Sequence, residues 1–222
     1  MQSTDLEMLL TSCVHDMKNS ISMIIDSVDN LSEEPKNTKE YLANLRYEAS
    51  RLNNDLMHLL GVYRMKEQEL PVVVDEHEVW EVLQQQFLKN EALLRKYNIA
   101  FELECDEDEI WYFDSVLIGG VINNVIVNTV RYTKTKIRLR VYRDQSKLCL
   151  EVSDDGNGYP KFMLQEKDVP LQSMNFQSGS TSLGLYFAAK VAKLHKKGEV
   201  LGHITLQNGG DLGGGIFTIY IP

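Results

Sequence analysis

The sequence predicts an α+β protein in which an antiparallel helical hairpin, forming a dimeric four-helix bundle, precedes an α/β sandwich. Three observations lead to this fold class. The first third of the chain carries a sustained heptad pattern of apolar residues. The remainder mixes short strand patterns with helical ones instead of alternating them strictly. A polar stretch at 67–71, which ends in proline, separates the two parts. We therefore expect one domain at 1–68 and a second at 72–222.

Two N-terminal segments space their apolar residues at alternating steps of four and three. In residues 4–31 these are Leu6, Leu10, Cys13, Met17, Ile21, Ile24, Val28 and Leu31, and in residues 38–66 they are Leu42, Leu45, Ala49, Leu52, Leu56, Leu59 and Tyr63. A 3.5-residue repeat of this length predicts two supercoiled helices, each ~40 Å long at the α-helical rise. Pro35 interrupts the pattern, so the two helices should run antiparallel.

The apolar stripe of the hairpin is wider than two helices can bury. Leu9, Val14, Ile25 and Leu60 lie beside the heptad seam and widen it. Pairing two hairpins into a four-helix bundle would bury this surface, which predicts a homodimer. The alternative is a monomeric hairpin that docks on the second domain.

The second domain should contain several short strands and a few helices. Its expected strands are at 72–75, 99–105, 111–113, 136–142, 148–152, 203–206 and 216–221, and its expected helices are at 78–94, 115–131 and 183–196. Asp114 or Ser115 is placed to cap the second of these helices. Strands and helices in this mixed order are typical of an α+β sandwich.

The amino-acid composition limits the kinds of partner that the chain can bind. The chain has 222 residues and a formal net charge of −9, which argues against nucleic acid and against anionic membranes. Acidic residues gather at 102–109, a run that we interpret as a solvated loop. No apolar stretch reaches the roughly 18 residues that span a bilayer, and the start lacks the profile of a signal peptide. Three cysteines without metal-ligand spacing fit a reducing cytoplasm.

His15 is the first candidate for chemistry. It falls between the apolar seam positions of the first helix, so its imidazole should face water. Asp16 follows it directly, and Asn19 lies one turn further on. An exposed imidazole beside a carboxylate is a candidate nucleophile.

Asn124 and Asn128 are the second candidate group, four residues apart and therefore on one helix face. Arg131 and Tyr132 follow on nearly the same side. Amide oxygens suit Mg²⁺, arginine suits phosphate, and an aromatic ring can cover a purine. The alternative is the solvated side of an amphipathic helix. The apolar neighbours oppose it, and buried asparagines need partners that a nucleotide with its metal would supply.

Glycine-rich segments form the third group. Asp154, Gly156 and Gly158 follow a predicted strand, where glycine lets backbone approach a ligand and the carboxylate can accept a bond from an exocyclic amine. The same residues also suit an ordinary turn. Residues 180–185 open a predicted helix whose N–H groups could face phosphate, and 213–215 are glycines. The patternless stretch at 159–179 is typical of a lid.

Taken together, these segments resemble the catalytic core of sensor histidine kinases, in which a phosphoacceptor hairpin precedes a Bergerat-type (GHKL) ATP-binding domain. Residues 15–21 are similar to the H box, residues 124–133 to the N box, and residues 154–158, 180–185 and 213–217 to three glycine boxes. The resemblance implies an ATP-dependent protein-histidine kinase that uses Mg²⁺ as a cofactor.

The resemblance also implies a role for each matching residue. His15 would accept the phosphoryl group, Asp16 would hold its Nδ1 proton, and Asn19 would orient water for dephosphorylation of a response regulator. The nucleotide-binding set would be Asn124, Asn128, Arg131, Tyr132, Asp154, Gly156, Gly158, Ser182 and Gly184. Within it, Asn128 would hold Mg²⁺ and Asp154 would bind the adenine amine.

Two features distinguish this chain from relatives of the implied family. ATPases of the gyrase and Hsp90 type carry a glutamate that activates water four residues before the metal-binding asparagine, and here that position is Asn124. An amide cannot accept a proton at neutral pH, which favours phosphate transfer over hydrolysis. The second glycine box retains only Gly184, with Ser180 and Ser182 in place of glycines.

Three functions remain in competition. The first is a histidine kinase that autophosphorylates His15 and passes phosphate to the receiver domain of a response regulator, with phosphatase activity as a further option. The second is a histidine phosphotransfer protein whose degenerate C-terminal domain binds no ATP. The third, a Bergerat-fold serine kinase, would not need residues 1–66. Retention of Asn128 and Asp154 favours the first.

Overall fold

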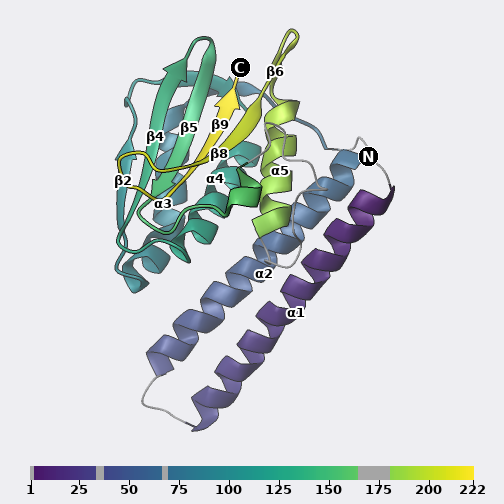
Figure 1. The fold of residues 1–222 in the computed structure, drawn as a ribbon, viewed down its shortest axis with the longest axis vertical. Coiled ribbons are helices and arrows are strands. Elements are labelled where there is room, and N and C mark those ends of the chain that lie inside the picture. Colours follow the sequence, from purple (N-terminus) through teal and green to yellow (C-terminus); the bar gives the residue numbers. More distant parts are fainter. Residues whose placement is uncertain (1–2, 34–37, 67–69, 165–180) are drawn as a thin grey trace. The chain divides into compact units, whose positions relative to one another are not determined.

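The computed structural model describes residues 3–33, 38–66, 70–164 and 181–222 (Figure 1). The described residues form two compact units: one holds the residues up to Leu70 together with 181–184, and the other holds 71–164 and 185–222. The N-terminal unit is helical, and the C-terminal unit combines a sheet with helices. The predicted fold class is therefore confirmed for the single chain.

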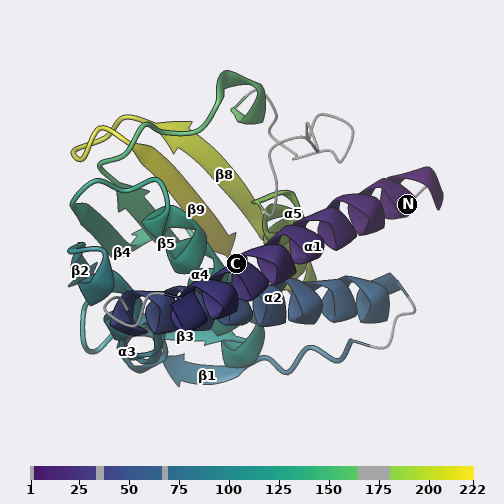
Figure 2. The same cartoon turned by 90° about the horizontal axis from the view of Figure 1, so that it is seen from below.

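Two long antiparallel helices form the N-terminal unit. Helix α1 spans Ser3–Glu33 and α2 spans Thr38–Lys66. They run side by side in both views (Figures 1 and 2). Pro35, the predicted terminator, lies outside the described residues.

The heptad residues divide between two faces of the hairpin. On α1, the residues Cys13, Ser20 and Ser27 are buried at seven-residue intervals. Ile21 and Val28, which the sequence places in the same seam, are 46% and 48% exposed. Other apolar residues of the two helices are also exposed, namely Val14, Met23, Ile25, Leu42, Leu56, Met57, Leu60 and Tyr63. A single chain therefore leaves much of the predicted seam uncovered.

Helix α2 carries a buried polar row that the heptad pattern does not predict. Glu48, Arg51, Asp55 and His58 recur at steps of three and four, and each is at most 7% exposed. Arg51 pairs with Glu48 at 3.5 Å. Burial lowers the pKa of His58 to about 4, so this ring is neutral at physiological pH.

A five-stranded sheet organises the C-terminal unit in the order β2-β4-β5-β9-β8. The strands are β2 (Ala100–Glu104), β4 (Lys136–Asp144), β5 (Lys147–Asp154), β8 (His203–Asn208) and β9 (Gly215–Ile221). Strand β2 pairs with β4 in parallel, and the other pairs are antiparallel. Helices α3 (Val79–Lys96), α4 (Ser115–Val130) and α5 (Thr181–Leu194) cover one face (Figures 1 and 2).

The core lies between this sheet face and the helices. Ile118, Ile122 and Ile126 recur every four residues on α4 and are fully buried. From the sheet they are joined in the buried set by Ile137, Leu139, Leu148, Leu150, Phe217, Ile219 and Ile221. Burying each such side chain contributes roughly 1.5–3 kcal/mol, so the core fixes α4 firmly on the sheet.

Two short ribbons flank the sheet, and both differ from the sequence-based prediction. Strand β1 (Asp75–Glu78) pairs with β3 (Ile110–Phe113), so the strand expected at 72–75 begins only at its last residue. The reason is that the Val73 N–H donates to the Asp114 carboxylate at 2.9 Å. Helix α5 ends at Leu194, and β6 (Lys196–Lys197) and β7 (Val200–Leu201) form a hairpin that was not predicted.

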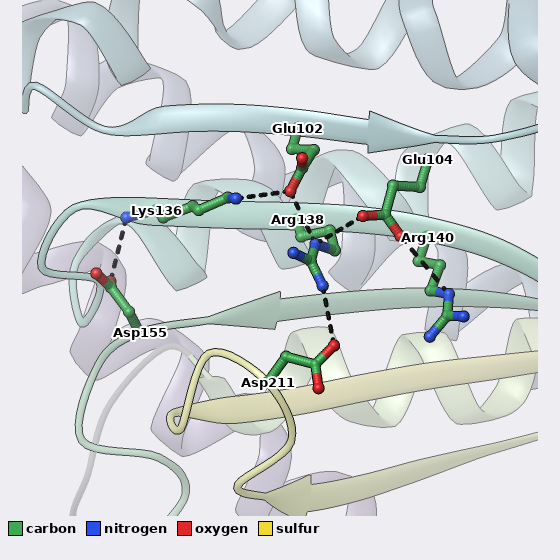
Figure 3. Close-up of polar contacts among 7 residues, drawn as sticks. All are labelled: Glu102, Glu104, Lys136, Arg138, Arg140, Asp155 and Asp211. Atoms are coloured by element: carbon green, nitrogen blue, oxygen red, sulfur yellow. Dashed lines mark hydrogen bonds and ion pairs between the residues drawn. The ribbon is translucent and has the colours of Figure 1, made fainter.

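The acidic run at 102–109 is not simply a solvated loop. Glu102 and Glu104 belong to β2 and face the basic residues of β4 across a parallel register (Figure 3). Arg138 contacts Glu102 at 2.8 Å, Glu104 at 3.0 Å and Asp211, which lies between β8 and β9, at 3.2 Å. The interpretation was wrong for these strand residues because cross-strand pairing, which the local sequence does not reveal, neutralises them.

Candidate functional site

The first part of the candidate site is the exposed face of α1 around His15. His15 and Asn19 are both exposed, as the position between seam residues predicts. The Asn19 Nδ2 atom lies 3.3 Å from the His15 Nδ1 atom. Nδ1 is the ring nitrogen nearer the backbone, so this contact leaves Nε2 as the outer nitrogen. The side chain of Asp16 lies outside the described residues.

The second part lies in the C-terminal unit and is organised by α4. Asp114 caps this helix, since its Oδ1 atom accepts from the N–H groups of Val116 at 3.1 Å and Leu117 at 2.9 Å. His195 at the end of α5 accepts the Asp114 N–H through Nε2 at 3.0 Å, and its Nδ1 lies 2.8 Å from the Val191 carbonyl oxygen. Both ring nitrogens of His195 thus contact the backbone, so we assign His195 a structural role.

Asn124 and Asn128 lie together one turn apart on α4. Asn128 donates from Nδ2 to the Oδ1 atom of Asn124 at 3.1 Å. Asn124 is only 6% exposed, whereas Asn128 is half-buried. The bond uses the donor of Asn128, so its Oδ1 atom is the atom that can serve as a ligand for a hard cation.

Arg131 and Tyr132 follow at the end of α4, and both are exposed. The Arg131 guanidinium lies 6.0 Å from the centre of the Tyr132 ring. This is the outer limit of a cation–π contact, and it brings together the two side chains that the sequence assigns to phosphate and purine.

Asp154 ends β5 beside the glycine-rich turns. It is 7% exposed, and its Oδ1 atom accepts the Gly156 N–H at 2.6 Å. Burial raises the pKa of Asp154, while backbone donors at Gly156 and Gly215 act in the opposite direction. A carboxylate held in this way is a fixed acceptor for an incoming amine.

Gly156 allows the backbone to pass close to α4. A Cβ atom at this position would collide with the Tyr132 carbonyl oxygen and lie 2.7 Å from the Asp154 Oδ1 atom. The neighbouring Asp155 closes the same turn, because its carboxylate accepts the N–H groups of Lys134 at 3.0 Å and Thr135 at 2.9 Å. Burial acts to raise the pKa of Asp155, but the Thr135 hydroxyl and the backbone N–H donors outweigh it and lower this pKa to about 2.

Tyr159 and Asn208 are site residues that the sequence did not indicate. Asn208 accepts the Tyr159 N–H at 2.6 Å and donates to the Tyr159 carbonyl oxygen at 2.8 Å. A Cβ atom on Gly215 would lie 3.0 Å from both the Tyr159 ring and the Asp154 Oδ2 atom, so ring and carboxylate flank one glycine. Burial raises the pKa of Tyr159. Gly158, whose φ is 75°, makes the turn between Asp154 and Tyr159.

The second glycine box is only partly described. Gly184 is buried in α5, while Ser180 and the side chain of Ser182 lie outside the described residues. The lid expected at 159–179 is described as far as a short 3-10 helix, η2 (Lys161–Met163).

The described donors suit a nucleotide with its metal. Asp154 offers a buried acceptor beside closely packed glycine turns, and Asn128 offers an amide oxygen on α4. Among the described residues, no group of three or more His, Cys, Asp and Glu side chains is arranged to hold a metal ion. The amide oxygen of Asn128 is a ligand type that suits Mg²⁺, which takes substrate phosphates and waters as further ligands.

One family profile matches the C-terminal part of the chain. It covers residues 113–222 and describes histidine kinase-, DNA gyrase B-, and HSP90-like ATPases. Residues 113–222 are an ATPase domain of this family. The domain contains Asn124, Asn128 and Asp154 together with the glycine turns, so the matched residues are those that build the candidate site.

Beyond the ATPase domain, the similarity extends to sensor histidine kinases. The sensor protein SrrB of Staphylococcus aureus is 26% identical over 192 residues, which cover 82% of this chain and 33% of SrrB. The chain thus spans about a third of the length of the curated relatives it matches.

Solved structures support the same fold. The histidine kinase AdeS of Acinetobacter baumannii aligns with a TM-score of 0.66 and 19% identity, covering 93% of this chain and 96% of AdeS. The histidine kinase ThkA, solved in complex with the response regulator protein TrrA, aligns with a TM-score of 0.60 and 23% identity over 94% of this chain and 59% of ThkA. The helical region followed by the ATPase domain is therefore the arrangement of a histidine kinase core.

None of the described helices is both long and apolar enough to cross a membrane.

Proposed function

We propose that the chain is the kinase core of a two-component signalling protein, with a phosphoacceptor domain at 1–68 and a catalytic domain at 72–222. In this proposal His15 is phosphorylated from Mg-ATP, and the phosphoryl group passes to an aspartate of a response regulator receiver domain. The observation that carries the proposal is the presence of an exposed histidine on α1 in a chain that also contains an ATPase domain.

Nucleotide binding would rest on the residues around α4 and β5. Asp154 would accept a bond from the adenine amine, and Tyr132 would lie against the base or ribose. Asn128, with Asn124 beside it, would hold Mg²⁺ through its amide oxygen, and Arg131 would contact phosphate. Gly156, Gly158, Gly184 and Ser182 would let the backbone or a hydroxyl approach the ligand.

Phosphoryl transfer would rest on positioning and charge neutralisation rather than on a protein base in the nucleotide site. Asn124 occupies the helix position four residues before Asn128 and carries no ionisable group. ATP supplies the phosphoryl group when bound. His15 is the acceptor of that group in place of water. Asp16 and Asn19 would act on the imidazole or on water beside it.

The response regulator is the partner that this chemistry requires. Support comes from ThkA, which was solved in complex with the response regulator protein TrrA. The exposed apolar residues of the hairpin favour a homodimer, since a second copy would cover them in a four-helix bundle. Cys13, Cys105 and Cys149 are thiols rather than disulfides, which favours a cytoplasmic location.

The decisive test is labelling by ATP in the presence of Mg²⁺. We expect a phosphoprotein that is labile in acid and stable in alkali, as a phosphoramidate is, and its loss in His15→Gln. His203→Gln is the matched control, because His203 lies on β8 outside the proposed machinery. If calorimetry detected no ATP binding while phosphate from a phosphorylated receiver domain still reached His15, the chain would be a phosphotransfer protein instead.

A further inference from the structure

The contact between Asn19 and His15 involves the ring nitrogen that would not carry the phosphoryl group. The two residues lie four apart on α1, so they share one face of the helix. The Asn19 amide nitrogen is 3.3 Å from Nδ1. The contact is fully local to α1, so it depends on no other element of the chain.

An asparagine side chain can satisfy Nδ1 whether or not that nitrogen carries a proton. Its carbonyl oxygen accepts from Nδ1–H, and after a half-turn of the amide its NH₂ group donates to the Nδ1 lone pair. A carboxylate can do only the first, because it is an acceptor. The orientation in the structure, with Nδ2 facing Nδ1, is the one that serves the unprotonated nitrogen.

We propose that Asn19 is a positioning residue for His15, holding Nδ1 in both of its proton states and thereby keeping Nε2 directed outward. The proposal rests on the proposed phosphorylation of His15 and gives Asn19 a role before any dephosphorylation. In this proposal Asn19 also holds the Nδ1 proton, whereas the sequence-based expectation assigned that proton to Asp16 alone.

Each stage of the reaction then has a matching amide orientation. The Nε2 lone pair forms the N–P bond as the bond from the γ-phosphorus to the bridging oxygen breaks, and ADP leaves with that electron pair. At this stage Nδ1–H donates to the Asn19 oxygen. When the Nδ1 proton passes to solvent, the neutral phosphohistidine presents a lone pair that accepts from the Asn19 NH₂ group.

The proposal is tested by nitrogen NMR of ¹⁵N-histidine-labelled protein at alkaline pH, where imidazole is neutral. The chemical shifts of Nδ1 and Nε2 give the ratio of the two tautomers. Asn19→Asp, which can only accept, should raise the fraction with Nδ1–H about threefold, as expected for one exposed charge-assisted bond. Asn19→Leu, of similar size but apolar, should give the ratio of free imidazole. Asn30→Asp adds the same charge to an exposed position of α1 and should change nothing.

Rates of ATP labelling provide the second measurement. The Asn19→Leu variant should be labelled about threefold more slowly than wild type, and Asn19→Asp faster than Asn19→Leu, because only the carboxylate retains the reactive tautomer. A purely structural role would slow both variants equally.

Two results would overturn the proposal. One is an unchanged tautomer ratio in both Asn19 variants, and the other is a ratio that responds to Asp16→Asn alone. The NMR experiment contains no nucleotide, so its outcome is independent of kinase activity. Absence of labelling in the wild-type chain would count against the proposed function and leave the Asn19 result standing.

Discussion

Asn128 donates a hydrogen bond to Asn124 from the preceding turn of α4, at 3.1 Å between Nδ2 and Oδ1. The bond fixes the rotation of both amides, because the nitrogen of one must face the oxygen of the other. It therefore presents the oxygen of Asn128, and not its nitrogen, as the remaining polar atom.

The first prediction concerns this oxygen. Asn128→Ala should weaken ATP binding about tenfold in the presence of Mg²⁺, roughly 1.4 kcal/mol, because a ligand of the metal is lost. Calorimetric titration with and without Mg²⁺ measures the effect, and the difference between the two conditions should shrink in the variant. Gln85→Ala removes an exposed amide from α3 and serves as control. An equal loss in both conditions would mean that Asn128 does not hold the metal.

Asp154 should be more important for binding than for folding. Burial raises its pKa above the ordinary value, so the ionised carboxylate is less favourable in the folded chain than in the unfolded one. Asp154→Asn removes this cost, while its amide no longer offers two acceptor atoms to an incoming amine. We expect a melting temperature within a few degrees of wild type and ATP affinity lower by about 1.5–3 kcal/mol. Thermal melting and calorimetry on the same preparation test both parts, and a large loss of melting temperature would contradict the assignment.

Asp155 should dominate the acid sensitivity of the glycine turn. Its pKa is lowered to about 2, so its stabilising contribution is complete above the ordinary value of 3.8 and is lost as pH falls towards 2. At neutral pH, Asp155→Asn should lower the free energy of unfolding by about 1 kcal/mol, a figure discounted for solvent screening. Urea unfolding at several pH values measures it. The gap between wild type and variant should close at low pH, and a constant gap would show that packing, not charge, explains the loss.

Arg138 provides a prediction about salt. It connects β2 with the segment between β8 and β9 through Glu102 and Asp211 (Figure 3). Ion pairs at the surface contribute little singly, so Arg138→Met should lower stability slightly at low ionic strength and less as salt screens the wild-type pairs. Arg95→Met is the control, since its pair with Glu91 is far more exposed. Identical salt dependence in wild type and the Arg138 variant would rule out an electrostatic role.

The exposed apolar face of the hairpin predicts the effect of a single charge. Leu56 is 56% exposed on α2, and Leu88 is 58% exposed on α3. If a second hairpin covers Leu56, Leu56→Lys should convert a dimer into a monomer, since an unpaired buried charge is strongly unfavourable. Leu88→Lys should leave the assembly unchanged. Light scattering after size-exclusion chromatography measures the molar mass of each variant. A monomeric wild-type chain would refute the dimer.

The parts of the fold with local signals could be predicted from the sequence. The heptads predicted both long helices, and Asp114 was recognised as the cap of α4 from its position before an apolar helix. Strand β1 was placed too early because a run of valines was interpreted as a strand, whereas the Val73 N–H bonds to an aspartate 41 positions away. Strands as short as β6 and β7 have no periodicity to detect.

The candidate site shows the same division. Asn124 and Asn128 were predicted to share a face, and their hydrogen bond confirms it. Tyr159 and Asn208 were missed because they lie 49 positions apart in the sequence. Their only local signal is that Tyr159 directly follows Gly158. For His15, exposure was predicted correctly, but the contact with Asn19 could not be chosen over one with Asp16 from spacing alone.

The close approach of Gly156 to the Tyr132 carbonyl has an implication for sequence comparison. Any side chain at position 156 would strike the end of α4, so folding demands glycine there whether or not a nucleotide ever binds. A descendant that had lost catalysis, a pseudokinase, would keep this glycine for as long as it kept the fold. Inactive members of such a lineage are therefore better recognised by the loss of an amide like that of Asn128 than by the state of the glycine motif.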